Sequence, residues 1–410
     1  MKSLLAVSWE MPPMYGPRGT QVARTLGALA AIGWRSTVVC MAPRRGGPHW
    51  PDKAPFAPPA GVDVLRVPSP EDWTIVRAAW RIAPALRDYP DTKRVWIGPA
   101  TRAALSAASA GKSAGLVTFA QPWSNHLIGL RVRRRTALPW VAHFSDPWVD
   151  SPYATARQQA IWRPLEAAVV RAASALVFVS DETAELVMRK YPDEWRHKVS
   201  VVPQGFDTRA APAVASPRRA GPLRIVYTGR FYAGVRTPLA LLRALASLNA
   251  AQPLAGTLEL AFVGPHVDAF ARDAAALGVA PLVRFQGRVP PVEAAAAAAA
   301  ADVLLVIDAP STGPSVFLPS KLVDYLPFRK PILGITPEPG AAAALLRRLG
   351  CPVAPPDDIA GIAAALAELV RQWRAATLGV SESFDRVAVE FEIGRVAARF
   401  NDVLVRAFER

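Results

Sequence analysis

The stretch LPSKLVDYLPFRKPILGI, residues 318–335, decides the fold. It predicts a loop, a helix capped by Ser320 and then a buried strand. Lys321 and Asp324 fall in the first turns of that helix. A helix N-terminus offers free backbone N–H groups and a partial positive charge, which suit a phosphate. An acid one turn later suits the two hydroxyls of a ribose, so the stretch indicates nucleotide binding.

The composition indicates a globular chain of two or three domains. The 410 residues are 51% hydrophobic and 20% charged, and the formal net charge is +15. Such a charge attracts polyanions, which include nucleic acid, acidic membranes and phosphorylated ligands. Cys40 and Cys351 are expected to be core residues, because two cysteines build neither a disulfide framework nor a zinc site.

The start of the chain reads as a first strand. Its apolar run is short and meets Glu10, which is not typical of a signal peptide. No apolar run reaches the length of a transmembrane helix. We therefore expect a cytoplasmic protein, either free or peripheral at the inner face of the membrane.

Strands and helices alternate along the whole chain, which predicts an α/β protein with parallel sheets. We expect two doubly wound Rossmann-like domains that face each other across a cleft. The expected domains are residues 1–207 and residues 223–383, and each would hold one substrate. Residues 208–222 form the linker, and residues 384–410 have the periodicity of a helix. Strand candidates are residues 4–9, 36–41, 62–67, 94–97, 116–120, 140–144, 175–179, 199–202, 224–228, 259–263, 283–286, 303–307, 331–335 and 352–354.

Open parallel sheets bind ligands at the carboxyl ends of their strands. The strand at residues 224–228 runs into Gly229 and Arg230, and Arg236 follows before the next helix. Two arginines at a strand exit are suited to neutralise a diphosphate, although a loop with solvated arginines would have the same pattern.

Two segments of the first domain are candidates for the acceptor side. Gly16 and Gly19, after the first strand, permit close approach of the backbone to a ligand, or simply form an ordinary turn. His143 and Asp146, followed by Trp148, stand at a strand exit, where they could bind sugar hydroxyls or transfer a proton, or be structural. The basic run at residues 131–135 fits a solvated helix end as well as a membrane or phosphate contact.

Metal and nucleophile signatures do not appear in the sequence. The five histidines lack metal-ligand spacing, and neither an Asp-x-Asp pair nor a Gly-x-Ser-x-Gly motif occurs. We expect no metal and no cofactor. A nucleic-acid partner is not expected either, because no aromatic–basic binding module is present.

Several motifs in a fixed order resemble a known family. They are VPQGFD (202–207), TGRFY (228–232), FVGP (262–265), VRFQGRV (283–289), ADVLLV (301–306) and PSKLVDYL (319–326), preceded by the glycine loop after the first strand. The chain resembles the retaining GT-B glycosyltransferases of family four, also called glycosyl transferases group 1. The resemblance implies that residues 1–207 bind the acceptor and that residues 223–383 bind the nucleotide sugar. It also implies that the helix over residues 384–410 packs on the first domain. The Asp146-Pro-Trp148 segment resembles a subgroup from bacterial surface-polysaccharide clusters.

The resemblance implies roles for individual residues. Arg230 and Arg236 would hold the donor diphosphate, and Asp324 would stand where a glutamate usually holds the ribose. Val316 occupies the position of a glutamate that usually contacts the transferred sugar. The other residues expected on the donor side are Gly229, Gly313, Pro314, Ser315, Phe317, Ser320 and Lys321.

The expected reaction is transfer of a sugar from a nucleotide-diphosphate sugar to a glycan or lipid-linked acceptor, with retention and without metal. The leaving diphosphate can itself accept the proton of the acceptor, so the protein only stabilises charge on that diphosphate. Two alternatives stay open: an epimerase or hydrolase with the same fold, and a relative that binds sugars but has lost activity, which Val316 would explain.

Overall fold

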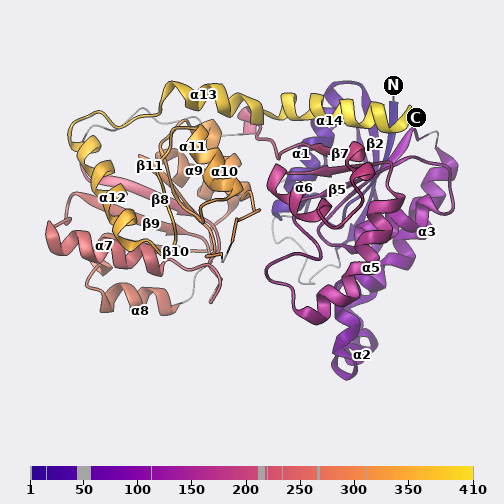
Figure 1. Cartoon of the computed structure of the whole chain (residues 1–410), viewed down its shortest axis with the longest axis horizontal. Helices are drawn as coiled ribbons and strands as arrows, with labels where there is room; N and C mark the ends of the chain where they lie inside the picture. The colour runs from indigo at the N-terminus through magenta and orange to yellow at the C-terminus, as the bar shows by residue number, and fades with distance from the viewer. Residues whose placement is uncertain are drawn as a thin grey trace. The chain divides into compact units, whose positions relative to one another are not determined.

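The computed structural model describes residues 2–14, 16–43, 57–111, 113–210, 218, 220–232, 234–265, 268–311 and 313–409. The chain divides into two compact units (Figure 1). The first unit is Met1–Gly205 together with Ile393–Arg410, and the second is Phe206–Glu392. Most of the expected linker, residues 211–217 and 219, lies outside the described residues.

The first unit is built on a parallel sheet of seven strands in the order β3-β2-β1-β4-β5-β6-β7. Its central strands are buried along nearly their whole length because helices cover both faces, as in other doubly wound folds. The strands are β1 Lys2–Val7, β2 Trp34–Ala42, β3 Val62–Pro68, β4 Gly115–Phe119, β5 Trp140–Phe144, β6 Ala175–Phe178 and β7 Val199–Val201. The helices are α1 Pro17–Ala31, α2 Thr74–Ile82, α3 Ile97–Ala110, α4 Ser124–Arg133, α5 Ala156–Ala172, α6 Asp181–Met188 and α14 Ile393–Phe408.

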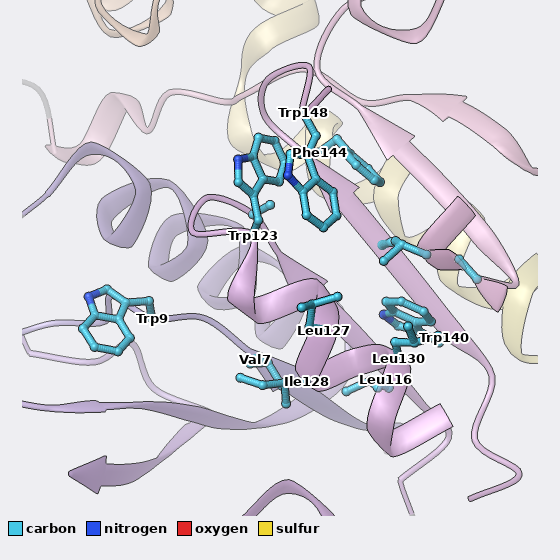
Figure 2. Close-up of a cluster of buried hydrophobic side chains, with 14 of the residues drawn as sticks. Val7, Trp9, Leu116, Trp123, Leu127, Ile128, Leu130, Trp140, Phe144 and Trp148 are labelled. Carbon is cyan, nitrogen blue, oxygen red and sulfur yellow. The ribbon is translucent and has the colours of Figure 1, made fainter. Parts of the chain in front are cut away.

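A cluster of aromatic and aliphatic side chains fills one side of this sheet. Figure 2 shows Trp123, Phe144 and Trp148 grouped together at the start of α4. The indole rings of Trp123 and Trp148 stack with centroids 5.0 Å apart and an interplanar angle of 5°. Large buried rings of this kind contribute much of the hydrophobic stabilisation of a domain.

The second unit has a parallel sheet of six strands in the order β10-β9-β8-β11-β12-β13. The strands are β8 Leu223–Thr228, β9 Leu258–Val263, β10 Val283–Gly287, β11 Val303–Ile307, β12 Ile332–Ile335 and β13 Val353–Ala354. The helices are α7 Leu239–Ala251, α8 Asp268–Ala276, α9 Pro291–Ala300, α10 Ser320–Tyr325, α11 Ala341–Arg348, α12 Ile359–Arg374 and α13 Glu382–Ala388. The run of alanines from residue 294 to residue 300 lies in the crossover helix α9.

Two expected elements differ in the structure. The strand predicted at residues 94–97 is a 3-10 turn, Arg94–Trp96, that leads directly into α3. Trp96 explains the difference, because its buried indole donates a hydrogen bond to the carbonyl of Val67 and fills the core without any strand partner. The single C-terminal helix is instead two helices, α13 and α14, with a 3-10 turn between them.

Helix α14 packs on the first unit's sheet, whereas α13 belongs to the second unit. The Trp34 indole donates to Asn401 Oδ1 at 2.9 Å, and the Phe400 ring lies against Phe119. The hydrophobic stripe of α14 is therefore part of the core of the first unit.

The strand order places one topological switch point in each sheet. In the first unit the chain passes outward from β1 to β3 and returns at β4, so the switch lies between β1 and β4. In the second unit it lies between β8 and β11. Crevices at such points, beyond the carboxyl ends of the strands, are where this class of sheet binds ligands. Among the described residues, no helix is long and apolar enough to cross a membrane.

Candidate functional site

The switch point of the second unit is formed by the loops after β8 and β11. Gly229 and Arg230 directly follow β8. The loop after β9 packs closely on them: a Cβ atom on Gly264 would lie 2.0 Å from the carbonyl oxygen of Gly229. Gly264 also has φ +139°, so only glycine fits there. The FVGP motif thus holds the β8 loop in place.

Arg230 and Arg236 lie on one tight turn, as the sequence predicted. The Tyr232 and Arg236 backbones exchange hydrogen bonds of 2.8 and 2.9 Å, and Arg236 Nη2 donates to the carbonyl of Arg230 at 3.0 Å. Both guanidinium groups lie over the Tyr232 ring, at 6.0 Å for Arg230 and 5.1 Å for Arg236. Arg236 Nε is buried and has no hydrogen-bond partner among the described residues. A buried donor without a partner is costly, and it is typical of a position that a ligand or water completes.

Asp308 is part of this edge and was not predicted from the sequence. It follows β11 directly, is 6% exposed, and accepts hydrogen bonds from the Ala309 amide at 2.9 Å and from Ser315 Oγ at 3.5 Å. Burial raises the pKa of Asp308, and the Ala309 amide and the nearby Arg236 oppose that rise. Asp308 therefore links the arginine turn to the loop that carries Ser315. The signal in the sequence was an acid immediately after the apolar run of β11.

Helix α10 differs from the prediction at its start. Ser320 is its first residue and does not cap it; the N-cap is Pro319, without a side-chain hydrogen bond. The helix has only six residues, and what fixes it is Tyr325. The Tyr325 hydroxyl accepts a hydrogen bond from the Thr228 amide at 2.8 Å and bonds to Thr228 Oγ1 at 3.0 Å. This contact brings α10, with half-buried Lys321 and Asp324, to the end of β8.

The loop before α10 is only partly available to a ligand. Gly313 and Pro314 are exposed and Phe317 is half-buried. The amide and carbonyl of Ser315 are both used internally, by Pro339 at 3.0 Å and by Ala341 at 2.8 Å. The backbone amide of Ser315, a residue expected on the donor side, is therefore not available to the donor.

Val316 is buried, with 7% of its surface exposed. An apolar side chain at this position belongs to the packing of the loop and offers no carboxylate to a sugar.

A cavity of about 290 Å³ lies beside the arginine turn. Its lining includes Gly234, Thr237, Asp308, Pro310 and Pro356. Polar and apolar groups at a strand edge with this volume fit a small organic group.

The first unit has its own charged cluster at the β1–β4 switch point. Arg18, on the first turn of α1, places Nη2 3.0 Å from His143 Nδ1. The His143 ring also lies against Phe119 at 5.3 Å and Phe400 at 5.8 Å. Because a guanidinium can only donate, Nδ1 accepts and the imidazole proton is on Nε2. Burial lowers the pKa of His143 well below its usual value, and Arg18 and His126 lower it further, so the ring is neutral.

Arg18 was also missed by the sequence analysis. Burial lowers its pKa to about 10, while Asp146 and Glu10 oppose this, so the group stays charged at neutral pH. Arg18 Nε is buried without a partner among the described residues, as Arg236 Nε is in the other unit. The only signal was a cation on the turn that follows the first strand.

Asp146 lies in the same cluster. Its Oδ2 accepts from Ser145 Oγ at 2.7 Å and from Gln121 Nε2 at 3.3 Å. Burial raises the pKa of Asp146, and Ser145, Arg18 and Gln121 oppose the rise. His143 and Asp146 are therefore brought to one edge, as the sequence predicted, and Arg18 interacts with both of them.

Two expectations for the acceptor side need correction. Gly16 and Gly19 make room for Glu10, because a Cβ at Gly16 would lie 2.2 Å from Glu10 Oε2 and one at Gly19 would lie 2.9 Å from its Cβ. Glu10 Oε2 accepts the Gly19 amide at 3.3 Å, so a carboxylate of the protein occupies the start of α1. Trp148 is fully buried against Trp123 and is a core residue, not an acceptor contact.

Among the described residues, no group of three or more His, Cys, Asp or Glu side chains is placed to hold a metal ion.

Comparison with known proteins gives two domain matches. Residues 18–205 match the glycosyl transferase 4-like domain family, and residues 222–372 match glycosyl transferases group 1. No curated protein sequence matches the chain.

Solved structures share the fold over the whole chain. Sucrose-phosphate synthase from Thermosynechococcus elongatus has a TM-score of 0.70 at 16% identity, with 100% of both chains covered. Anabaena HepE, in complex with UDP and glucose, has a TM-score of 0.65 at 16% identity, with 98% of this chain and 99% of that chain covered. WaaG, a glycosyltransferase of lipopolysaccharide biosynthesis, has a TM-score of 0.62 at 16% identity, with coverages of 98% and 99%. The chain thus belongs to the glycosyltransferases of the GT-B fold, with a glycosyl transferase 4-like domain followed by a group 1 domain.

Proposed function

We propose that this glycosyltransferase moves a sugar from a nucleotide-diphosphate sugar to a glycan or lipid-linked acceptor, with retention and without a metal ion. The observation that carries the proposal is the β8–β11 switch point. There, Arg230 and Arg236 share one turn, and Arg236 has a buried N–H without a partner among the described residues. Two guanidinium groups on one turn match the charge of a diphosphate.

The donor residues act by charge stabilisation. As the bond from the sugar to the diphosphate breaks, negative charge grows on the leaving oxygen, and Arg230 and Arg236 stabilise it. Asp308 keeps the Arg236 turn in register with the loop at Ser315. Asp324 of α10 is the candidate for the ribose hydroxyls. The acceptor's hydroxyl oxygen bonds to the anomeric carbon on the face from which the diphosphate departs, and the departing diphosphate takes the proton of that hydroxyl, which gives retention.

The first unit supplies the acceptor side in this proposal. His143, fixed by Arg18 with its proton on Nε2, is a hydrogen-bond donor toward a sugar hydroxyl. Asp146 is an acceptor for such a hydroxyl. Neither residue has to exchange a proton with the substrate.

Of the possible donor nucleotides we propose a uridine nucleotide, because HepE was solved with UDP and glucose. Val316 is buried and apolar. The contact to the transferred sugar is therefore proposed to differ from the one that a glutamate usually makes at this position in the family. The buried Val316 also favours the second candidate function, a relative that binds nucleotide sugars without transferring them.

The test is turnover with UDP-, GDP- and ADP-sugars in EDTA, with candidate glycan and lipid-linked acceptors. We expect release of one nucleoside diphosphate, loss of that release in Arg230→Ala, and a product with the donor's anomeric configuration by NMR. Release only with added Mg²⁺ or Mn²⁺ would overturn metal independence, and an inverted product would overturn retention. Diphosphate binding without turnover of any sugar would establish the inactive relative.

A further inference from the structure

Helix α2 and its flanks expose an unusual amount of apolar surface. No residue of the helix is buried. Figure 1 shows α2 projecting from the first unit, beyond α3 and α5. The exposed fractions are 62% for Trp73, 74% for Ile75 and 85% for Ile82. Leu86 and Tyr89, just after the helix, are exposed as well. Single exposed apolar residues are normal, but a cluster of this kind marks an interaction surface.

The helix has three distinct faces. Ile75, Ala78, Ala79 and Ile82 follow the spacing i, i+3, i+4, i+7, so they form one apolar stripe, and all four are exposed. Val76 and Trp80 lie one turn apart on another face and are half-buried, so that face contacts the unit. The apolar stripe therefore does not take part in packing α2 against the first unit.

The third face is basic. Arg77 and Arg81 are one turn apart and exposed, and Arg87 follows the helix. None of the three arginines has an acidic partner among the side chains that the structure describes. They line an open pocket of about 410 Å³ together with Trp80 and Thr92.

Two further charges line this pocket, but they cancel each other. Lys93 Nζ lies 2.8 Å from Glu71 Oε2. The pocket keeps the net positive charge of its arginines, which is complementary to a phosphate.

We propose that α2 is an interfacial anchor for an acidic lipid bilayer. Ile75 and Ile82 enter the boundary between headgroups and acyl chains, and the arginine pocket holds lipid phosphate groups. Apolar and basic stripes side by side on one short helix are the pattern of helices that lie in a membrane surface. The charge complementarity favours anionic lipid over a neutral surface.

The basic run at residues 131–135 is a weaker candidate. Arg133 Nη1 donates to the carbonyls of Ala137 and Leu138, at 3.0 and 3.2 Å, and Arg135 Nη1 donates to that of Arg131 at 3.4 Å. These arginines close the end of α4, so only part of the run is free to meet a membrane.

The test is flotation of the full chain with vesicles of phosphatidylcholine containing 30% phosphatidylglycerol, and with vesicles of phosphatidylcholine alone. We expect binding to the first and little to the second. Ile75→Gln with Ile82→Gln lowers the partition coefficient by roughly 100-fold. Arg77→Gln with Arg81→Gln lowers it by roughly 30-fold, because each arginine near an acidic surface contributes about fivefold.

Matched controls separate this surface from general charge or stickiness. Val292→Gln changes an equally exposed apolar residue of the second unit, and Arg131→Gln changes the other basic run. Both are expected to bind acidic vesicles like the wild type, and all variants to keep the wild-type melting temperature.

Three results would overturn the proposal. The first is that the wild type does not bind acidic vesicles. The second is that the Ile75/Ile82 double variant binds them as well as the Val292 control does. The third is that the wild type sediments as a dimer and the double variant as a monomer. The last result would assign the stripe to a second copy of the chain. No nucleotide sugar is present in these assays, so their outcome is independent of the proposed transfer reaction.

Discussion

Removal of one oxygen atom at Tyr325 tests how the donor edge is held together. Tyr325→Phe deletes the hydroxyl that accepts the Thr228 amide at 2.8 Å and bonds to its Oγ1 at 3.0 Å. Both side chains are buried, so water cannot replace the lost partner. An unsatisfied buried amide costs about 1–3 kcal/mol, and the second hydrogen bond contributes about 1 kcal/mol. The expected loss is about 2–4 kcal/mol.

The melting temperature measured by calorimetry reports this loss. For a domain of this size, 1 kcal/mol corresponds to a shift of about 2–4 °C, so the second unit should melt about 4–16 °C lower. Thr228→Val is the matched variant, because it removes only the Oγ1 contact and leaves the amide bonded to Tyr325. It should lose about 1 kcal/mol. A Tyr325→Phe protein that melts within 1 °C of the wild type would refute the reasoning.

Three other changes have defined outcomes. Gly264→Ala places a Cβ 2.0 Å from a backbone oxygen at φ +139°, so it should prevent binding of nucleoside diphosphate in a titration, and unchanged affinity would contradict this packing. Arg230→Ala should lower kcat/KM by about 100-fold or more at an unchanged melting temperature, since the side chain is exposed and proposed to act only on the diphosphate. The pKa of His126 is lowered to about 3 and that of His143 is also lowered, so unfolding takes up protons and stability should fall as the pH drops from about 6.5 toward 4. The raised pKa of Asp146 has the opposite effect on the pH dependence of stability. The wild type is therefore compared with His143→Gln, whose melting temperature should fall less steeply over that pH range. Equal slopes of melting temperature against pH in the two proteins would count against a neutral buried His143.

The sequence predicted the fold well because its signals were local and strong. The apolar run of β11 and the alanine run of α9 each point to one element whatever surrounds them. The segment at residues 94–97 failed for the opposite reason. Its apolar residues suit a strand, but Trp96 fills the core from a turn, and that depends on a carbonyl of β3 far away in sequence.

The candidate site was predicted in part. Arg230 and Arg236 were recognised because a strand exit with basic residues is a pattern along the chain. Arg18 and Asp308 were missed because each matters through a partner more than seventy residues away, His143 for the one and Arg236 for the other. Such pairs are created by the sheet order and are not visible in a single stretch of sequence.

The glycines near the N-terminus also show what cannot be predicted from the sequence alone. Gly16 and Gly19 do mark a close approach, as predicted, but the group that approaches is the carboxylate of Glu10. Trp148 was expected at the acceptor because of its neighbours in sequence, whereas its contact with Trp123 makes it part of the core. A residue type reports that a position is constrained, and only the structure identifies what constrains it.

The most direct test of the central claim is the melting temperature of the protein with UDP, GDP, ADP, CMP and dTDP in the presence of EDTA. A ligand at 100 times its Kd stabilises the folded state by about 2.7 kcal/mol, which corresponds to a shift of about 5–10 °C. The account predicts that one diphosphate gives such a shift in the wild type and in the exposed control Arg243→Ala, and none in Arg236→Ala. No shift with any of the nucleotides, or an equal shift in Arg236→Ala, would contradict a diphosphate site at the β8–β11 edge.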